Sequence, residues 1–436
     1  MCLILCLAAS PLRGQDKPLR SIIDDSTLRT RVKDTWFSEI PAQIMGRAPV
    51  MHNLDGGGRV QLRTETGPDE FLVILARELN GTFPGYAQGS WMLIRRKDNG
   101  APTRIRVFLR SDPYMYVQFR PFSADKSLMD IVLYDAYMVR SLPLAVPFER
   151  LYTIPVEEAL ALAGDKFPRR YFEPDPENYR DKRQFITQVR SRLPELTFGD
   201  DGAIDETGRY VYINSGAAQI GEQGLNCSGF TKWLIDGMLR PLTGERLAIP
   251  PLKAPFGERG STYTDLWEEL RDPFFGLDWI RNLASTAGTI LRAPSYASLE
   301  EIEVREEPFS ELIIRSRNGS STIRSYPGFL ENAGYGIEGL TPLLYTLAID
   351  EPGRFYLVAV NNEMGPPTTE ANPRGRPRMR QYFHVAALIP YFDEYGVFQV
   401  AVFESAEETS LSAFRNRYPG HYISLVRVPL ETVFEP

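Results

Sequence analysis

Short β-rich runs between residues 59 and 137 constrain the fold of this chain more than any other feature. Six runs combine alternating apolar residues with β-branched and aromatic side chains: RVQLRTE, EFLVILARE, SWMLIRRK, RIRVFLRS, MYVQFRPF and LMDIVLYDAY. Turn signals such as GTFPG, KDNGAP, RSDP and SADKS separate them. Strands joined by short turns pair with their neighbours in an antiparallel sheet. We therefore predict an accessory β-domain over residues 20–142, without obvious chemistry of its own.

After residue 143 the pattern changes to helical spacing. IPVEEALALAGDKF, NYRDKRQFITQVRSRL and, after a Gly-rich loop, NCSGFTKWLIDGMLRPLTG have apolar residues at helical intervals. In the last of these, Asn226 or Ser228 is the expected N-cap and Pro241 the expected end. From residue 354 the chain is β-rich again, in RFYLVAVNN, QYFHVAALIPYF, GVFQVAVFES and YISLVRVPL. We predict an α+β domain over residues 143–436.

The first residues, MCLILCLAAS, form an apolar run followed by Pro11, Arg13 and a polar stretch. Residues 1–15 therefore resemble the apolar and cleavage regions of a secretory signal, although a buried N-terminal strand has the same composition. Cleavage would leave Cys227 as the sole cysteine of the mature protein. A lone cysteine in an exported protein forms no internal disulfide, so it is either a buried small hydrophobe or a reactive thiol.

Composition excludes several classes of function. The net charge is −7 and the arginines are scattered, so no basic field favours nucleic acid. Three dispersed histidines and one mature cysteine do not make a usual zinc site, and no phosphate-binding loop motif is present, so we expect neither metal nor cofactor. No stretch of 18 uninterrupted apolar residues predicts a membrane span. We expect a monomer.

Two features commonly lower the pKa of a cysteine thiol: a helix N-terminus and a neighbouring histidine. Cys227 lies at the start of its predicted helix and so has the first of them. Of His52, His384 and His421, only His384 lies on a predicted strand directly after a long polar loop. If the following turn is centred near Glu394, His384 and Glu404 face each other, since both lie equally far from it. Glu404 is then an orienting carboxylate, or, after a slip of one residue, merely a charge on the other face.

The segment LNCSGFTKWL resembles the D-C-S-G-F motif of NlpC-type cell-wall peptidases, and FHVAALIPYFDEYGVFQVAVFESA resembles their histidine strand and polar hairpin. The resemblance implies a papain-like domain with Cys227, His384 and Glu404 as catalytic residues. YVYINSGAAQIGEQGLNC is a looser version of an upstream tyrosine segment. Asn226 replaces the usual Asp, Glu404 is an uncommon third residue, and residues 241–345 form a long insertion between the cysteine and the histidine.

By this resemblance the chain is an α+β enzyme of the bacterial periplasm or envelope that hydrolyses a peptide or amide bond in the peptidoglycan stem peptide. Cys227 attacks, His384 transfers the proton and Glu404 orients the imidazole. Tyr212, Tyr210 and Ser228 are the candidates for substrate and oxyanion contacts. Two alternatives stay open: a non-catalytic envelope protein that binds wall fragments or a partner, and an acyltransferase or amidase with the same dyad.

Overall fold

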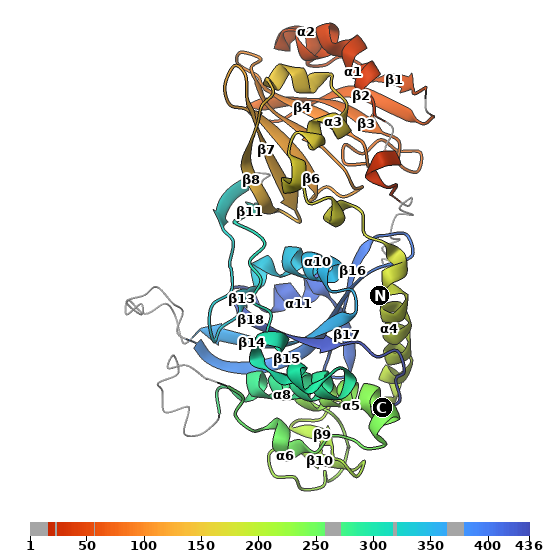
Figure 1. The fold of residues 1–436 in the computed structure, drawn as a ribbon, viewed down its shortest axis with the longest axis vertical. Coiled ribbons are helices and arrows are strands. Elements are labelled where there is room, and N and C mark those ends of the chain that lie inside the picture. Colours follow the sequence, from red (N-terminus) through yellow and green to blue (C-terminus); the bar gives the residue numbers. More distant parts are fainter. Residues whose placement is uncertain (1–15, 22–23, 56, 258–271, 317–320, 364–378) are drawn as a thin grey trace, which may run out of the picture. The chain divides into compact units, whose positions relative to one another are not determined.

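The structure is a computed structural model that describes residues 16–21, 24–55, 57–257, 272–316, 321–363 and 379–436 (Figure 1). The signal-like segment 1–15, residues 258–271 of the predicted insertion and most of the long polar loop before His384 lie outside the described residues. The fold is α+β. None of the helices in the described ranges is long and apolar enough to cross a membrane.

The chain divides into two compact units. The first comprises Met1–Pro174, Phe309–Ser325 and Glu394–Val397, and the second comprises the remainder. The boundary thus lies at Pro174 rather than at 142, because residues after the sheet pack back onto the N-terminal helices. Arg29 is almost fully buried and donates to the carbonyl oxygens of Tyr152 (3.0 Å) and Ile154 (2.6 Å).

An antiparallel sheet of ten strands forms the first unit, and its strand order follows the sequence. The strands are β1 (Val50–Asn53), β2 (Arg59–Thr66), β3 (Glu70–Arg77), β4 (Trp91–Arg96), β5 (Pro102–Val107), β6 (Tyr116–Pro121), β7 (Ser127–Leu133), β8 (Ala136–Leu144), β11 (Glu311–Arg315) and β12 (Ser321–Ser325). The hairpin β11–β12, part of the predicted insertion, instead completes this sheet, because Glu311 and Leu312 pair with Tyr137 and Ala136.

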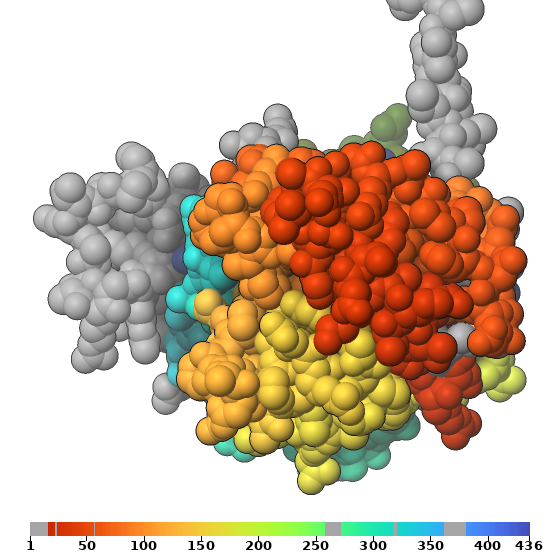
Figure 2. Space-filling model, turned by 90° about the horizontal axis from the view of Figure 1, so that it is seen from above, coloured from red at the N-terminus to blue at the C-terminus, as the bar shows by residue number. Residues whose placement is uncertain are grey.

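Short helices accompany this sheet: α1 (Ser26–Val32), α2 (Pro41–Ile44) and α3 (Val156–Ala161). In the space-filling view the red N-terminal segment lies beside the yellow segment that follows the sheet (Figure 2). Phe37 packs edge-on against Tyr152 at 5.8 Å, which joins these two segments through their aromatic rings.

The second unit is built on a six-stranded antiparallel sheet with the order β13-β18-β14-β15-β16-β17. Its strands are β13 (Tyr335–Gly336), β14 (Arg354–Glu363), β15 (Met379–Phe392), β16 (Phe398–Glu404), β17 (Glu407–Ser410) and β18 (Tyr422–Pro429). A separate small hairpin pairs β9 (Gly202–Ile204) with β10 (Tyr210–Tyr212). The four long strands predicted from the sequence are confirmed.

Helices cover both faces of the six-stranded sheet. They are α4 (Arg180–Arg192), α5 (Cys227–Thr243), α6 (Ile249–Leu252), α8 (Phe275–Leu291), α9 (Leu299–Ile302), α10 (Leu340–Asp350) and α11 (Leu411–Arg417). Figure 1 shows α5 and α8 side by side on one face, with α10 on the other. Trp279 and Ile280 of α8 are fully buried in the core against the sheet, so this part of the predicted insertion is a structural layer of the domain.

Helix α5 continues past its predicted end at Pro241. Proline lacks the N–H that would bond the carbonyl of Gly237 one turn earlier. The backbone N–H of Glu435 donates to that carbonyl instead, at 2.7 Å, so the helix reaches Thr243 without leaving the group unsatisfied. Gly244 then ends the helix in the left-handed region, at φ 77°.

Candidate functional site

A cleft of about 950 Å³ opens at the N-terminal end of α5 in the second unit. Its walls come from the start of α5, from the loop before β9, from the start of α8 and from the first half of β15. Cys227, Ser228, His384 and Val385 all line it. The cleft therefore brings together the cysteine and the histidine that the sequence singled out.

Cys227 is the first residue of α5, and Asn226 caps the helix. The Asn226 side chain accepts a hydrogen bond from the Gly229 N–H at 2.8 Å, which settles the choice between the two predicted caps. A Cβ on Gly229 would lie 1.9 Å from the carbonyl oxygen of Gly202, so only glycine allows this close approach of α5 to β9. Backbone-to-backbone contact thus fixes the position of the thiol.

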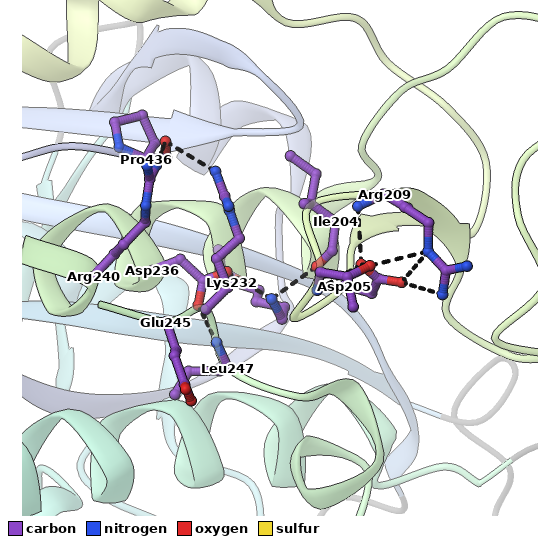
Figure 3. Close-up of polar contacts among 12 residues, drawn as sticks. Ile204, Asp205, Arg209, Lys232, Asp236, Arg240, Glu245, Leu247 and Pro436 are labelled. Atoms are coloured by element: carbon purple, nitrogen blue, oxygen red, sulfur yellow. Dashed lines mark hydrogen bonds and ion pairs between the residues drawn. The ribbon is translucent and has the colours of Figure 1, made fainter. Parts of the chain in front are cut away.

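Two further contacts anchor α5. The buried Trp279 of α8 donates from its indole Nε1 to the carbonyl oxygen of Ser228, at 3.0 Å. One turn along α5, Lys232 and Asp236 form a buried ion pair of 2.6 Å (Figure 3). Lys232 also donates to the Ile204 carbonyl at 2.8 Å, which ties the helix to the end of β9. The helix start is therefore held from two sides.

His384 lies beside an irregularity of β15. Val360 of β14 pairs with His384, but the next residue, Asn361, pairs with Tyr382, so Phe383 is an extra residue in the strand. Because of this bulge, Tyr382 and Val385 both belong to the same core cluster although they are three residues apart. Bulges often re-aim side chains next to functional sites. The imidazole reaches both the Cys227 thiol and the Glu404 carboxylate.

Glu404 lies on the expected face but two residues away from the expected register. The ladder pairs Ala387 with Phe403, so the same register sets Glu404 opposite Ala386 rather than His384. A shift of two residues keeps a side chain on its face of the sheet. The two side chains meet diagonally, with 2.6 Å between His384 Nε2 and Glu404 Oε2. Since Glu404 occupies Nε2, Nδ1 is the ring nitrogen left for the thiol.

Arg417 is a site residue that was not predicted from the sequence. Its Nη1 lies 2.5 Å from Oε1 of Glu404, the oxygen that His384 does not use. Ser410 caps the short helix α11 by accepting from the Ala413 N–H, and this helix delivers Arg417 to the carboxylate. The next residue, Tyr418, places its ring 5.5 Å from the imidazole of His384. A Ser cap before LSAFRNR was the available signal for this helix.

Electrostatics at the site favour a thiolate and an imidazolium. Burial raises the pKa of the Cys227 thiol, but hydrogen bonds from His384, the Val385 N–H and Ser228 hold that pKa below its usual value. Burial lowers the pKa of His384, yet its bonds to Cys227 and Glu404 raise that pKa to about 9. Burial likewise opposes ionisation of Glu404, but His384 and Arg417 bring its pKa below the usual range. The thiolate is the nucleophilic form of cysteine.

The other predicted candidates have different surroundings. Ser228 lines the cleft, and its hydroxyl bonds the Cys227 sulfur rather than pointing at an open oxyanion position. Tyr210 and Tyr212 do not line the cleft; Tyr210 packs against the core, and Tyr212 pairs with Gly202 at the end of the small hairpin. Nothing in the geometry supports their predicted role at the oxyanion.

The arrangement is that of a nucleophile, a proton-transfer group and an orienting carboxylate in sequence from the cleft inward. His384 and Glu404 have side-chain exposures of 13% and 5%, so the relay is shielded while the cleft itself is open. Among the described residues, no group of three or more His, Cys, Asp or Glu side chains could hold a metal ion. The chemistry that these side chains can perform is acyl transfer through a thioester.

Comparison with known proteins concerns the first unit alone. Residues 18–171 match the family described as "Domain of unknown function (DUF8515)". No curated protein and no solved structure matches the chain. The matched segment contains none of the residues that line the cleft. The similarity is therefore limited to this segment of the first unit, and the description of the cleft depends on its geometry alone.

Proposed function

We propose that the protein is an exported, papain-like cysteine hydrolase of the NlpC type that cleaves a peptide or amide bond in the stem peptide of peptidoglycan. The observation that carries the proposal is the contact row Cys227–His384–Glu404 at one cleft. Its order along the chain supports the resemblance: the cysteine begins a helix, the histidine lies on a following strand, and the acid lies on the next strand.

In the proposed reaction the Cys227 thiolate attacks the carbonyl carbon of the scissile bond. The carbon–nitrogen bond then breaks, and the imidazolium of His384 gives its proton to the leaving amine, which leaves a thioester on Cys227. Neutral His384 next takes a proton from water, and the hydroxide equivalent releases the carboxylic acid. The Cys227 sulfur and the His384 imidazolium are restored, so atoms and charges balance over the cycle.

The oxyanion of each tetrahedral intermediate needs hydrogen-bond donors in place before the reaction. The first N–H groups of a helix have no partner within the helix and carry its positive end. The backbone N–H of Cys227, at the first position of α5, is the donor that we assign to this role. Asn226 occupies the Gly229 N–H, so capping leaves the earlier amide to the substrate.

The charges of the cleft support a peptide substrate with a free amino group. Among the described residues, three carboxylates line it, from Asp200, Asp201 and Asp272, against one ammonium group, from Lys253. Lys253 is held by the carbonyls of Ile213 and Asn214, at 3.1 and 3.2 Å. A net negative cleft attracts cationic groups. Stem peptides that contain a diamino acid present such a group, and export to the periplasm or envelope would bring the enzyme to them.

The test uses purified cell-wall sacculi and the full chain. Release of soluble stem-peptide fragments, followed by mass spectrometry, should occur with the wild type and disappear with Cys227→Ala and His384→Ala. His52→Ala is the matched control, because His52 lies on β1 in the first unit and does not line the cleft. Fragment release by Cys227→Ala would overturn the proposal.

The same preparation separates the two alternatives. A non-catalytic protein would bind sacculi without releasing fragments, and its Cys227 would be alkylated by iodoacetamide only near the ordinary thiol pKa of about 8.5. An acyltransferase would form a new amide when a primary amine is added, in place of the free acid. Product analysis with and without the added amine therefore distinguishes hydrolysis from transfer.

A further inference from the structure

The first unit contains a second cavity, of about 320 Å³, on one face of its ten-stranded sheet. Side chains from β5, β6, β7, β8, β11 and β12 line it. Five of the lining residues are arginines, against one carboxylate. The arginines are Arg104, Arg106, Arg120, Arg140 and Arg315. The positive charge of these guanidinium groups must be balanced by carboxylates or by a ligand.

Four of these arginines have a carboxylate of their own. Arg104 pairs with Glu70 at 2.6 Å and Arg120 with Asp130 at 2.7 Å. The other two pairs are Arg315 with Asp135, at 2.5 Å, and Arg140 with Glu311. Within the described part of the chain, these five guanidinium groups and four carboxylates leave one positive charge in excess. The excess falls on Arg106.

Among the described residues, Arg106 has no carboxylate partner. Its Nε donates to the amide oxygen of Gln118 at 3.0 Å, and its guanidinium carbon lies 4.5 Å from the ring centre of Tyr116. Gln118 in turn donates to Asp130 at 3.1 Å, so a neutral amide lies between Arg106 and this carboxylate. Both terminal nitrogens of Arg106 lack a hydrogen-bond partner among the described residues and are left for a ligand.

The surroundings of the half-buried Arg106 disfavour its charged form. Burial lowers the pKa of Arg106, and the like charges of Arg104 and Arg315 lower it further. A charge that is buried without a partner is destabilising, and such a feature is retained where a ligand supplies the missing partner. The Tyr116 ring beneath the guanidinium plane holds the fork in one orientation.

We propose that this cavity binds the carboxylate of a small organic monoanion, with Arg106 as its bidentate partner. One excess positive charge matches one negative charge, and the planar guanidinium fork matches a carboxylate. The cavity volume is at the lower end of the range for small-molecule pockets. Ile313, Ile323 and the Tyr137 ring provide apolar lining, so the anion carries a compact apolar body.

Benzoate is the probe, and binding to the full chain is measured by calorimetry in a low-salt buffer. We expect benzoate to bind, its neutral analogue benzamide not to bind, and Arg106→Gln to weaken benzoate binding at least tenfold. Arg96→Gln is the matched control, because Arg96 is an exposed arginine of β4 whose partner is Asp98 and which does not line the cavity. The control should bind benzoate as the wild type does.

A stability readout separates loss of the ligand site from loss of the fold. Because Arg106 is an unpartnered charge, Arg106→Gln should unfold at the same temperature as the wild type or higher. If Arg106→Gln fails to fold, Arg106→Lys is the second variant. It keeps the charge but removes the guanidinium fork, and it should bind benzoate at least tenfold more weakly than the wild type.

Equal binding of benzamide, no binding of benzoate, or unchanged benzoate affinity in the Arg106 variants would overturn the proposal. Binding of phenyl phosphate in place of benzoate would overturn the carboxylate assignment. These measurements do not depend on any activity at Cys227.

Discussion

Arg417 and His384 hold the two oxygens of one carboxylate, that of Glu404, at 2.5 and 2.6 Å. Four charged groups therefore follow one another from the surface to the cleft: guanidinium, carboxylate, imidazolium and thiolate. Each neighbour favours the charged form of the next, since opposite charges at contact distance stabilise one another. These neighbouring charges favour the thiolate form of the half-buried Cys227.

Removal of the Arg417 charge should lower the reactivity of the Cys227 thiol without abolishing it. Arg417→Gln frees one carboxylate oxygen, which lets Glu404 rotate and raises its pKa. Because the Arg417 side chain is 49% exposed, solvent screens part of its effect, and we expect a loss of about tenfold or less in the alkylation rate of Cys227 by iodoacetamide at pH 6. Arg417→Lys should recover part of the rate. An unchanged rate in Arg417→Gln would contradict the proposed link.

The pH profile of hydrolysis should be bell-shaped. The active thiolate–imidazolium pair exists above the lowered pKa of Cys227 and below the pKa of His384, which is raised to about 9. In Glu404→Gln the imidazolium loses its anionic partner, so the pKa of His384 falls and the basic limb of kcat/KM moves to lower pH. His52→Ala should leave both limbs in place. A basic limb that does not move in Glu404→Gln would show that the carboxylate does not act through His384.

Gly229→Ala should misplace the nucleophile. The new Cβ would lie 1.9 Å from the Gly202 oxygen and 2.9 Å from the Ala203 Cα, which are both main-chain atoms, so α5 must shift. Overpacking of this kind costs about 1–3 kcal/mol. We expect a lower melting temperature and a large loss of Cys227 reactivity in the molecules that stay folded. Gly353→Ala is the control, because a Cβ there has no neighbour within 4 Å. Wild-type reactivity in Gly229→Ala would contradict backbone positioning of the thiol.

A buried lysine makes stability depend on pH. Burial lowers the pKa of Lys182 from 10.5 to about 7, and its Nζ donates to the Pro390 carbonyl at 2.9 Å. The unfolded chain therefore binds more protons than the folded chain between about pH 7 and 10.5, so this group makes the fold more stable as pH rises through that window.

Lys182→Met removes this dependence. Compared with the wild type, the variant should gain more melting temperature at pH 6 than at pH 9.5, with about 2–4 °C for each kcal/mol. The exposed Lys166 offers the control, Lys166→Met, which should show no such trend. A difference between variant and wild type that is constant across pH would contradict a neutral buried lysine.

Local patterns predicted the elements well but not their partners. Alternation and turn residues identified the strands from Arg59 to Tyr137 and the four long strands after Arg354, because these signals act within a few residues. The hairpin β11–β12 lies within the range that was predicted as an insertion. Its place at the edge of the first sheet depends on pairing with β8, over a separation in sequence that no local pattern encodes.

At the candidate site, too, local patterns were predictable from the sequence and contacts between distant elements were not. Face alternation was sufficient to bring Glu404 to His384, because an error of two residues in register preserves the face. The bulge at Phe383 and the ion pair of Glu404 with Arg417 lay beyond the sequence analysis, since both depend on how neighbouring elements dock. The tyrosines 210 and 212 were predicted from a loose motif, and the folded hairpin directs that strand elsewhere.

Because residues 309–325 belong to the first unit, separate stretches of the gene encode this domain. A gene fragment that encodes residues 18–174 as one continuous piece lacks two of the ten strands, and β8 becomes a bare edge open to pairing with other chains. Such a piece would also lack Ile313 and Arg315. Recombination at a single crossover therefore cannot move this domain intact. Any relative that carries it alone must have replaced the missing edge or covered it by other means.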